Sequence, residues 1–241
     1  MSLERTYAFQ YLKKTDLSFK TLGLREIYIE PTSPYKSYPQ AERIELPLNR
    51  FPETPNFFEI LRSRRSDRKY RGYPITKEEI ALLCFAVQGV TAKAGPYLLR
   101  TAPSAGALYP IETYLAVNYA QDLTPGIYHF EIRSFTLEKL REGNFGKLLR
   151  DLALGQAFFE SASVVFLWSA VFRRTMAKYG ERGLRYIFMD VAHISQNLLL
   201  TAVALGFKAC PVGAFLDEEV TEFLDLDGNE ERVIYLATVG K

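Results

Sequence analysis

Residues 184–212, LRYIFMDVAHISQNLLLTAVALGFKACPV, contain the pattern that decides the fold class. Apolar residues recur at three- and four-residue spacing through Leu184–Leu205, which predicts one long helix, and Gly206 is a typical helix stop. Further apolar positions widen the stripe, so we expect the helix to be broadly buried. Phe207–Val212 has the composition of a short strand. A buried helix that leads directly into a strand predicts helices layered on a sheet.

The segments on either side of this stretch contain further helices and strands. Ser163–Ala170, SVVFLWSA, is a nearly continuous apolar run, as expected for a strand covered on both faces. We expect other strands at Glu112–Asn118, 126–132, Phe135–Leu140 and Arg232–Val239. We expect other helices after the cap Asn56, after Thr76 with a capping box to Glu79, over Phe145–Leu154 and over Asp217–Leu224, and a loop over Val90–Pro103. This order predicts an α+β, three-layer fold with a mixed sheet.

The composition excludes several classes of protein. The 241 residues suit one large domain, and a hydrophobic fraction of 48% excludes global disorder. A net charge of +2 argues against a nucleic-acid coat or a polybasic membrane-surface protein. Two cysteines and two histidines provide neither a disulfide framework nor a metal site, which favours a reducing cytoplasm. Because no stretch is a signal peptide or long enough to span a membrane, we expect a soluble, cytoplasmic protein.

The first 55 residues differ from the rest in their proline content. Six of the 12 prolines fall within residues 31–55, which should therefore be extended and irregular. Tyrosine and other apolar residues are interleaved with the prolines. A disordered leader and an arm pinned across a surface by its aromatic side chains both fit this pattern, and the aromatic residues favour the arm. We therefore divide the chain into a Pro/Tyr-rich arm, 1–55, and a globular domain, 56–241.

The charges are distributed unevenly along the chain. Residues 62–71, RSRRSDRKYR, hold six basic side chains and one acid. Arginine binds phosphate well because its planar guanidinium donates two hydrogen bonds and stays charged. A solvated helix end, a nuclear-import-like run and a nucleic-acid patch are the alternatives. Nucleic acid is disfavoured because no second basic stripe or stacking platform accompanies the cluster.

Three more segments have residue types suited to a binding site. Residues 102–110, APSAGALYP, place four small residues between two prolines, so another surface can approach the backbone closely. Lys178 lies beside Tyr179, and a lysine with a lowered pKa can act as a base. Residues 209–214, ACPVGA, are a strand end whose N–H groups could face a ligand. Taken singly, each also fits a structural interpretation as a tight connection, a polar helix start or a strand exit.

The order of these motifs resembles a known family. R-R-S-x-R, P-S-A-G-A-L-Y-P, K-Y-G-E-R-G-x-R-Y, H-I-S-Q-N and G-F-x-A-x-P-V-G occur in that order, as in the nitroreductase superfamily and, more narrowly, its SagB/McbC-type branch of FMN-dependent dehydrogenases. The resemblance covers residues 60–240. It implies a three-layer α-β-α fold with a mainly antiparallel sheet. It also implies an intertwined homodimer that binds two FMN molecules at its interface.

The resemblance also implies roles for individual residues. The segment that contacts the FMN phosphate, ribityl chain and pyrimidine edge matches Arg64, Arg65, Ser66 and Arg68. The loop that packs on the flavin from the other subunit matches Pro103, Ser104, Ala105, Gly106 and Leu108. The backbone near the flavin N5 matches Pro211, Val212, Gly213 and Ala214. Further polar positions near the cofactor match Gln156 and Arg185, and Lys241 is the candidate for a C-terminal basic group near the phosphate.

Lys178 and Tyr179 match a Lys-Tyr pair that azoline-oxidising members use for proton transfer during aromatisation. In the motif around His193, Ala192 stands where the family usually has glycine, and we interpret His193 as a structural polar group in the core. The implied reaction is oxidation of an azoline-like ring, in a small molecule or a peptide, by hydride transfer to FMN. One alternative is ping-pong, NAD(P)H-dependent reduction of nitro or quinone compounds. Another is a non-enzymatic flavin-binding or docking module of a peptide-modification complex.

Overall fold

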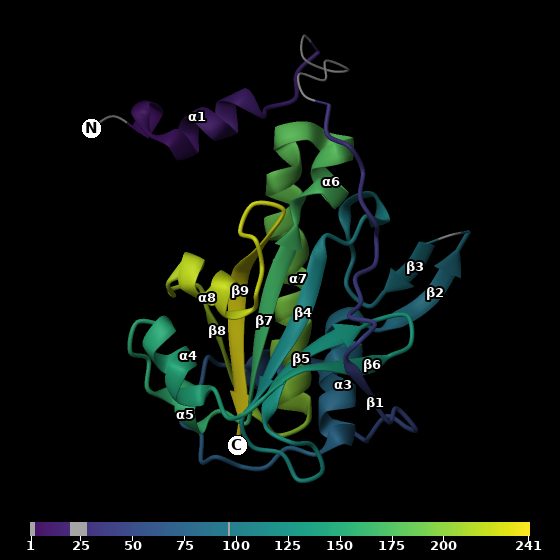
Figure 1. Cartoon of the computed structure of the whole chain (residues 1–241), viewed down its shortest axis with the longest axis vertical. Coiled ribbons are helices and arrows are strands. Elements are labelled where there is room, and N and C mark those ends of the chain that lie inside the picture. The colour runs from purple at the N-terminus through teal and green to yellow at the C-terminus, as the bar shows by residue number, and fades with distance from the viewer. Residues whose placement is uncertain (1–2, 20–27, 96) are drawn as a thin grey trace.

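A seven-stranded sheet forms the centre of the computed structural model, which describes residues 3–19, 28–95 and 97–241 (Figure 1). The strand order is β1-β6-β5-β4-β7-β9-β8, and each neighbouring pair is antiparallel. The strands are β1 (Glu42–Glu45), β4 (Ile111–Val117), β5 (Gly126–Glu131), β6 (Thr136–Glu142), β7 (Val164–Val171), β8 (Lys208–Val212) and β9 (Glu231–Gly240). Two isolated parallel bridges, Ser66 to Ala209 and Ile75 to Ala120, join loops to this framework.

Helices cover both faces of the sheet, as Figure 1 shows. One apolar core lies between the sheet and the helices α3 (Lys77–Gln88) and α7 (Gly183–Ala204), and a second lies under α4 (Gly146–Leu152), α5 (Phe158–Ser161) and α8 (Asp217–Phe223). The remaining helical segments are η1 (Leu3–Arg5), α1 (Tyr7–Lys14), α2 (Phe57–Ser63), η2 (Ala105–Ala107), α6 (Phe172–Tyr179) and η3 (Gly180–Arg182). The predicted α+β, three-layer fold is confirmed.

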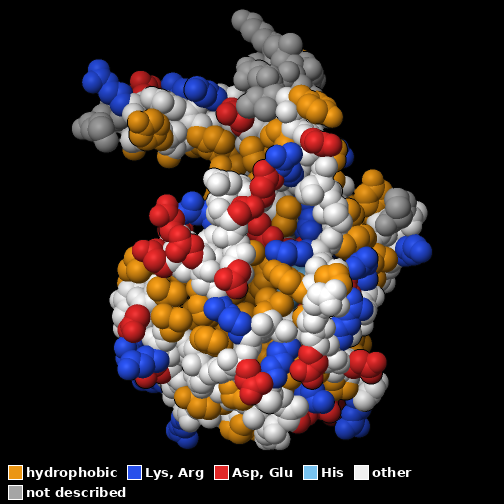
Figure 2. Space-filling view, viewed as in Figure 1, with side chains coloured by type: hydrophobic (Ala, Val, Ile, Leu, Met, Phe, Trp, Pro, Cys, Tyr) orange, Lys and Arg blue, Asp and Glu red, His pale blue; other side chains and the backbone are white. Residues whose placement is uncertain are grey.

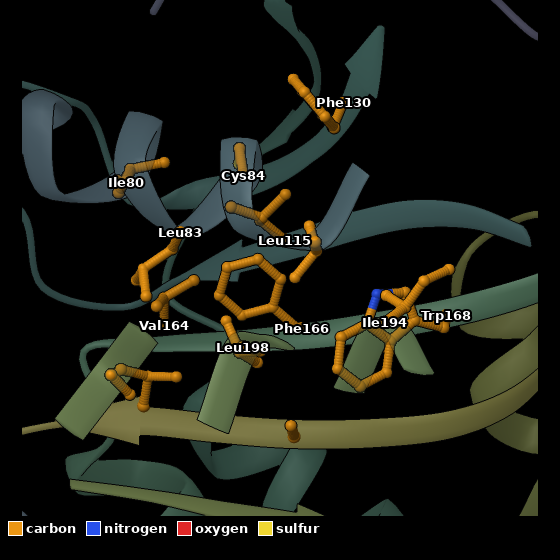
Figure 3. Packing of buried hydrophobic residues seen from close by; sticks show 14 of the residues in the cluster. Ile80, Leu83, Cys84, Leu115, Phe130, Val164, Phe166, Trp168, Ile194 and Leu198 are labelled. Carbon is orange, nitrogen blue, oxygen red and sulfur yellow. The ribbon is translucent and has the colours of Figure 1, made fainter. Parts of the chain in front are cut away.

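The central strands owe their places to uninterrupted apolar sequence. In β7, Phe166 and Trp168 belong to the core under α3 and α7, whereas Val165 and Leu167 belong to the opposite core. Figure 3 shows Phe166 packed among side chains of α3 and α7, including Leu198. A strand buried on both faces has no position for a solvated residue, which explains the apolar run.

Local capping signals place several helices where the sequence predicts them. The Thr76 hydroxyl accepts from the Glu79 N–H at 3.1 Å, and the Glu79 carboxylate accepts from the Thr76 N–H at 2.9 Å, so the capping box is formed. The Asn56 side chain accepts from the Phe58 N–H at 2.9 Å at the start of α2. The acidic residues at the start of α8 are exposed, and Figure 2 shows acidic side chains gathered over this helix.

Three predictions from the sequence are wrong. Residues 90–103 are not all loop, because β2 (Val90–Ala94) and β3 (Tyr97–Arg100) form an antiparallel hairpin whose turn contains Gly95 at a φ of +57°. The broad burial expected for 184–205 does not hold in this chain. Phe188 and Met189 are exposed, and so is His193, which we interpreted as a core group.

The arm is more structured than its prolines indicate. β1 extends the sheet by pairing with β6, and residues 7–14, for which the sequence predicted no helix, form α1 after the cap Thr6. Residues 33–38, hereafter the strap, cross one sheet face and are pinned there by aromatic side chains such as Tyr38, whose ring lies 5.2 Å from that of His129. Residues 1–2 and 20–27 of the predicted arm lie outside the described part of the chain.

Among residues 3–19, 28–95 and 97–241, one stretch, Phe172–Ala204, is long and apolar enough to cross a membrane by length and composition alone. The structure divides it into α6, η3 and α7, and one side of α7 packs on the sheet in the main core. Such packing is the property of a core helix in a domain.

Candidate functional site

The arginine-rich segment lies along the edge strand β8. Ser66 forms a parallel bridge with Ala209, and the Asp67 N–H donates to the Ala209 carbonyl at 3.1 Å. α2 ends at Ser63, and Arg64 has an extended ψ of 123°, so the chain leaves the helix in the direction that β8 requires. The sequence-predicted segments 64–68 and 209–214 are thus neighbours in the fold.

This edge carries more positive than negative charge. Asp67 has a cation beside it, since Lys208 Nζ lies 3.8 Å from its carboxylate. Within the described residues, the guanidinium groups of Arg64, Arg65 and Arg68 have no carboxylate partner. Three guanidinium groups in five residues repel one another unless an anion lies among them. The donor set therefore suits a phosphate group.

Two further residues of this edge surround Arg68. Its guanidinium lies 5.7 Å from the centre of the Phe158 ring, on α5. Burial raises the pKa of the Cys210 thiol, while the charge of Arg68 and its hydrogen bond to the thiol act in the opposite direction. Cys210 and Cys84 are both buried free thiols.

Gln156 links this edge to the segment after β8. Its amide Nε2 donates to the Ala214 carbonyl and to the Ala153 carbonyl, each at 2.9 Å. Val212 is buried, whereas Gly213 and Ala214 are exposed, so the end of β8 opens to the surface beside Gln156. The structure therefore brings together three groups of predicted residues: 64–68, 156 and 211–214.

A second cluster forms around the small-residue loop 103–109. The Ser104 hydroxyl donates to Asp190 Oδ2 at 2.5 Å, the Ala105 N–H donates to Asp190 Oδ1 at 3.3 Å, and the Tyr109 N–H donates to Ser104 Oγ at 2.9 Å. Burial raises the pKa of Asp190, and the hydrogen bonds from the Ser104 hydroxyl and the Ala105 N–H oppose that shift. Sequence reasoning missed Asp190, although a carboxylate on the apolar stripe of residues 184–205 was the available signal.

Lys178 and Tyr179 lie against the same loop. A Cβ atom on Gly106 would be 2.7 Å from Tyr179 Oη and 3.0 Å from Lys178 Nζ, and Gly106 has a φ of +66°. Glycine is needed here both for the backbone conformation and for the close approach. Lys178 and Tyr179, predicted to transfer a proton, therefore contact the loop predicted to pack on the flavin. Pro103, Ala105 and Leu108 belong to the same loop. Their catalytic and binding roles stay predictions.

The side chains of two predicted cofactor residues have other partners. Arg185 Nε donates to Thr15 Oγ1 at 2.8 Å, and its Nη2 lies 3.2 Å from Asp16, so its guanidinium holds the segment after α1. Lys241 Nζ lies 3.3 Å from the Glu79 carboxylate. Both cations thus have partners within this chain that compete with the predicted role at the cofactor.

An exposed apolar surface lies next to residues of both clusters along the chain. It consists of Phe57, Phe58 and Leu61 on α2 with Phe188 and Met189 on α7, two helices that contact each other. We call it the α2–α7 patch. It adjoins the arginine-rich segment through the end of α2, and it adjoins Asp190 directly along α7.

Comparison with known proteins identifies the family. The family model described as the nitroreductase family matches residues 61–241. The chain is 36% identical over 183 residues to a protein of Methanocaldococcus jannaschii named as a nitroreductase, with 76% of this chain and 89% of that protein covered. It is 29% identical over 133 residues to the microcin B17-processing protein McbC of Escherichia coli, covering 53% of this chain and 49% of McbC.

Solved structures share the fold. A protein from Anabaena variabilis named as a nitroreductase matches with a TM-score of 0.77 and 28% identity, over 97% of this chain and 46% of that one. The E. coli microcin synthetase McbBCD complex, with truncated pro-MccB17 bound, matches with a TM-score of 0.63 and 20% identity, over 96% of this chain and 86% of that one. A Desulfovibrio desulfuricans protein named as a nitroreductase, in complex with FMN, matches with a TM-score of 0.54 and 19% identity, over 78% of this chain and 87% of that one. The chain spans about half the length of McbC and of the Anabaena protein.

Proposed function

This chain belongs to the nitroreductase family and is an FMN-dependent oxidoreductase, and we propose that it is a SagB/McbC-type dehydrogenase that oxidises an azoline-like ring. The observation that carries the proposal is the meeting of Lys178 and Tyr179 with the loop around Gly106. The relationship to McbC, a peptide-processing protein by name, supports a ring within a peptide as the substrate. Bound FMN would accept the hydride from that ring.

The β8 edge supplies groups that would hold the cofactor. Arg64, Arg65 and Arg68 would bind its phosphate, because their guanidinium groups lack carboxylate partners among the described residues. The exposed backbone of Gly213 and Ala214, fixed by Gln156, would face the flavin ring. These residues fit FMN because a dianion needs cations and a flat ring needs small residues beside it.

Lys178 and Tyr179 would handle the proton. Oxidation of an azoline ring removes a hydride from one ring carbon and a proton from its neighbour, which leaves an aromatic azole. Lys178 Nζ would accept that proton, with Tyr179 Oη beside it to orient the amine. The Lys178 side chain is exposed in this chain, so it can be reached by a substrate.

We also propose that the active form is a homodimer. The β8 edge and the Gly106 loop form two separate groups of contacts, and the α2–α7 patch adjoins both. An exposed apolar surface of this kind is typical of an interface with another protein surface. Pairing through the patch would bring the loop of one protomer toward the arginine-rich segment of its partner. Two buried free thiols fit a reducing cytoplasm.

The second candidate is NAD(P)H-dependent reduction of nitro or quinone compounds. It is favoured by the higher identity and coverage of the Methanocaldococcus relative compared with McbC. Both reactions would use the same flavin site. The family assignment sets aside the non-enzymatic docking module.

Anaerobic flavin bleaching separates the two reactions. The FMN-loaded protein is mixed without oxygen with a thiazoline-containing peptide, with NADH or with NADPH, while the flavin absorbance is followed. Bleaching by the peptide, with formation of the thiazole by mass spectrometry, supports the dehydrogenase. Bleaching by a nicotinamide alone, with no thiazole, refutes it in favour of the reductase.

Matched variants test the individual assignments. Lys178→Ala should keep FMN and slow thiazole formation, whereas Lys147→Ala, another exposed lysine, should behave as wild type. Arg64→Ala and Arg68→Ala should weaken FMN binding relative to Arg50→Ala, an exposed arginine outside the cluster. Unchanged FMN affinity in both cluster variants would remove the phosphate assignment.

A further inference from the structure

One half of a sheet face carries buried charges instead of apolar residues. His129 on β5 lies directly opposite Glu138 on β6, and Glu112 on β4 lies diagonally across from His129. His129 Nδ1 is 2.9 Å from Glu138, and its Nε2 is 3.0 Å from Glu112. A histidine can donate from both ring nitrogens only as an imidazolium, so this geometry places a cation between two carboxylates.

Arg174 completes this row of charges from the first half of α6. Its side chain is 3% exposed, and Nη1 lies 2.6 Å from Glu112. Nη1 also donates to the Tyr109 carbonyl at 3.1 Å, and Nε donates to the Ser33 carbonyl at 2.8 Å. One guanidinium therefore joins α6, β4, the loop 103–109 and the strap.

The loop requires such anchors because its backbone is strained. Ala107 and Tyr109 have φ values of +54° and +46°, in the left-handed region that costs about 1–2 kcal/mol for a residue with a side chain. Asp190 holds the beginning of the loop through Ser104, and Arg174 holds its end through the Tyr109 carbonyl. Strained conformations of this kind persist only where surrounding contacts determine them.

Arg174 also fixes where α6 meets the loop. Lys178 and Tyr179 follow Arg174 by four and five positions, which is about one helical turn. α6 therefore contacts the loop twice: at Tyr109 through Arg174, and at Gly106 through Lys178 and Tyr179. The contact of Arg174 with Tyr109 therefore sets the distance of Lys178 and Tyr179 from Gly106.

We propose that Arg174 is a positioning residue that places Lys178 and Tyr179 against the Gly106 loop, with Glu112–His129–Glu138 as the row of counter-charges that holds its guanidinium. The catalytic part of this inference rests on the proposed function. Arg174 itself is buried behind the loop and need not touch the substrate. A buried ion pair with further hydrogen bonds is well suited to fixing one geometry.

The same row of charges ties the strap to the site. At one end Arg174 binds the Ser33 carbonyl, and at the other Glu138 accepts from the Tyr38 N–H at 2.9 Å. Between them, Lys36 Nζ lies 2.5 Å from Glu231. Because both ends of the strap bind the row, loosening Arg174 should loosen the strap and the loop together.

The test compares three variants of the FMN-loaded protein: Arg174→Gln, Arg174→Lys and Arg173→Gln. Arg173 is the neighbouring exposed arginine, paired with Glu230, and serves as the control. Lysine at 174 keeps the charge beside Glu112 but cannot reproduce the planar fork that reaches two carbonyls. Amide hydrogen exchange of residues 33–38 and 103–109 is measured by mass spectrometry, together with kcat, KM and the flavin absorbance spectrum.

We expect Arg174→Gln to raise exchange in both segments by about tenfold, as loss of a hydrogen-bonded anchor implies. We expect kcat to fall by roughly 10- to 100-fold with KM little changed, because the base is displaced rather than removed. Arg174→Lys should fold, and its amide exchange and kcat should lie between those of Arg174→Gln and wild type. Arg173→Gln should match wild type.

The inference would be overturned if both Arg174 variants kept the wild-type rate of amide exchange in the loop. It would also be overturned if Arg173→Gln changed loop exchange and kcat as much as the Arg174 variants do. If Arg174→Gln does not fold, Arg174→Lys alone decides. If wild type forms no thiazole, the proposed reaction fails, while the exchange data still decide whether Arg174 positions the loop.

Discussion

Replacing Glu112 by glutamine tests the energetics of the buried charges. Glu112 is 2% exposed and lies between Arg174, at 2.6 Å, and His129, at 3.0 Å. Burial alone would raise the pKa of this carboxyl group, but Arg174 and His129 outweigh burial and hold the pKa at about 2. Glutamine has nearly the same volume, so the substitution removes the charge with little change in packing.

The expected loss of stability at neutral pH is several kcal/mol. A pKa of about 2 in the folded protein, compared with 4.5 in the unfolded chain, corresponds to about 3 kcal/mol of stabilisation. Mutational experience with buried ion pairs agrees, since removal of one partner costs about 3–5 kcal/mol. We therefore expect Glu112→Gln to lower the free energy of unfolding by about 3 kcal/mol at pH 7.

Urea unfolding provides the assay, because the single tryptophan, Trp168, is fully buried and its fluorescence reports on the core. The folded-state pKa of Glu112 is depressed, so its stabilisation is present above the unfolded pKa and is lost as the pH falls toward the folded value. The deficit of the variant should shrink to under half of its neutral value near about pH 3. The control Glu142→Gln removes an exposed carboxylate paired with Lys139 and should cost less than about 0.5 kcal/mol.

Two results would refute this reasoning. A deficit below about 1 kcal/mol at pH 7 would mean that the buried charges contribute no more than a surface pair. A deficit that stays constant as the pH falls would mean that the lost stability comes from packing and not from the charge of Glu112.

The remaining predictions concern His129, Gly106 and Thr76. The two carboxylates outweigh burial and raise the pKa of His129, so its stabilisation is fully present below the unfolded pKa and is lost as the pH rises through the folded value. His129→Gln should therefore lose more stability at about pH 6 than at pH 9, and an equal loss at both would contradict this. Gly106→Ala and the control Gly155→Ala both place alanine at positive φ and should each cost about 1–2 kcal/mol in urea unfolding. Only the former should slow turnover, because its Cβ would displace the ends of the Tyr179 and Lys178 side chains, and equal turnover in the two variants would count against this placement. Thr76→Ala should cost about 1 kcal/mol in the same assay, since it removes half of the capping box.

The predictable part of the fold is the part that local sequence determines. The capping box at Thr76, the apolar run of β7 and the periodicity of α7 each express a requirement within one element. The hairpin at residues 90–100, which we predicted as loop, has strand-forming residues near Gly95, and among the described residues its two strands pair only with each other. Each of its strands is at most five residues long, which is too short to give a clear strand pattern in the sequence.

The exposed side of α7 shows a limit of a different kind. Phe188 has the spacing and apolarity of a core residue and Met189 beside it is apolar, yet this chain leaves both exposed. An apolar stripe indicates that a surface must be covered, but it does not say whether the same chain or another covers it. His193 on this side was misinterpreted for the same reason.

The sequence indicated the segments of the candidate site but not the buried charged residues that hold those segments in place. Resemblance marked the arginine-rich segment and the Gly106 loop because their residues lie close together in sequence. Glu112, His129 and Glu138 lie on three strands, and each looks like an ordinary polar position of an alternating strand. Only the register of β4, β5 and β6 shows that they meet.

The strap explains how the sheet can bury these charges at all. Pro34 within the strap and Pro39 just after it disfavour helix, so the backbone there is extended and several of its polar groups lack intrahelical partners. Those groups are what the charges need: the Ser33 carbonyl accepts from Arg174, and the Tyr38 N–H donates to Glu138. Lys36 adds a cation for Glu231, which lies 195 residues away in sequence. The prolines that made this segment look irregular therefore allow it to cover a charged sheet face, and removing the strap would take one hydrogen-bond partner from Arg174 and one from Glu138.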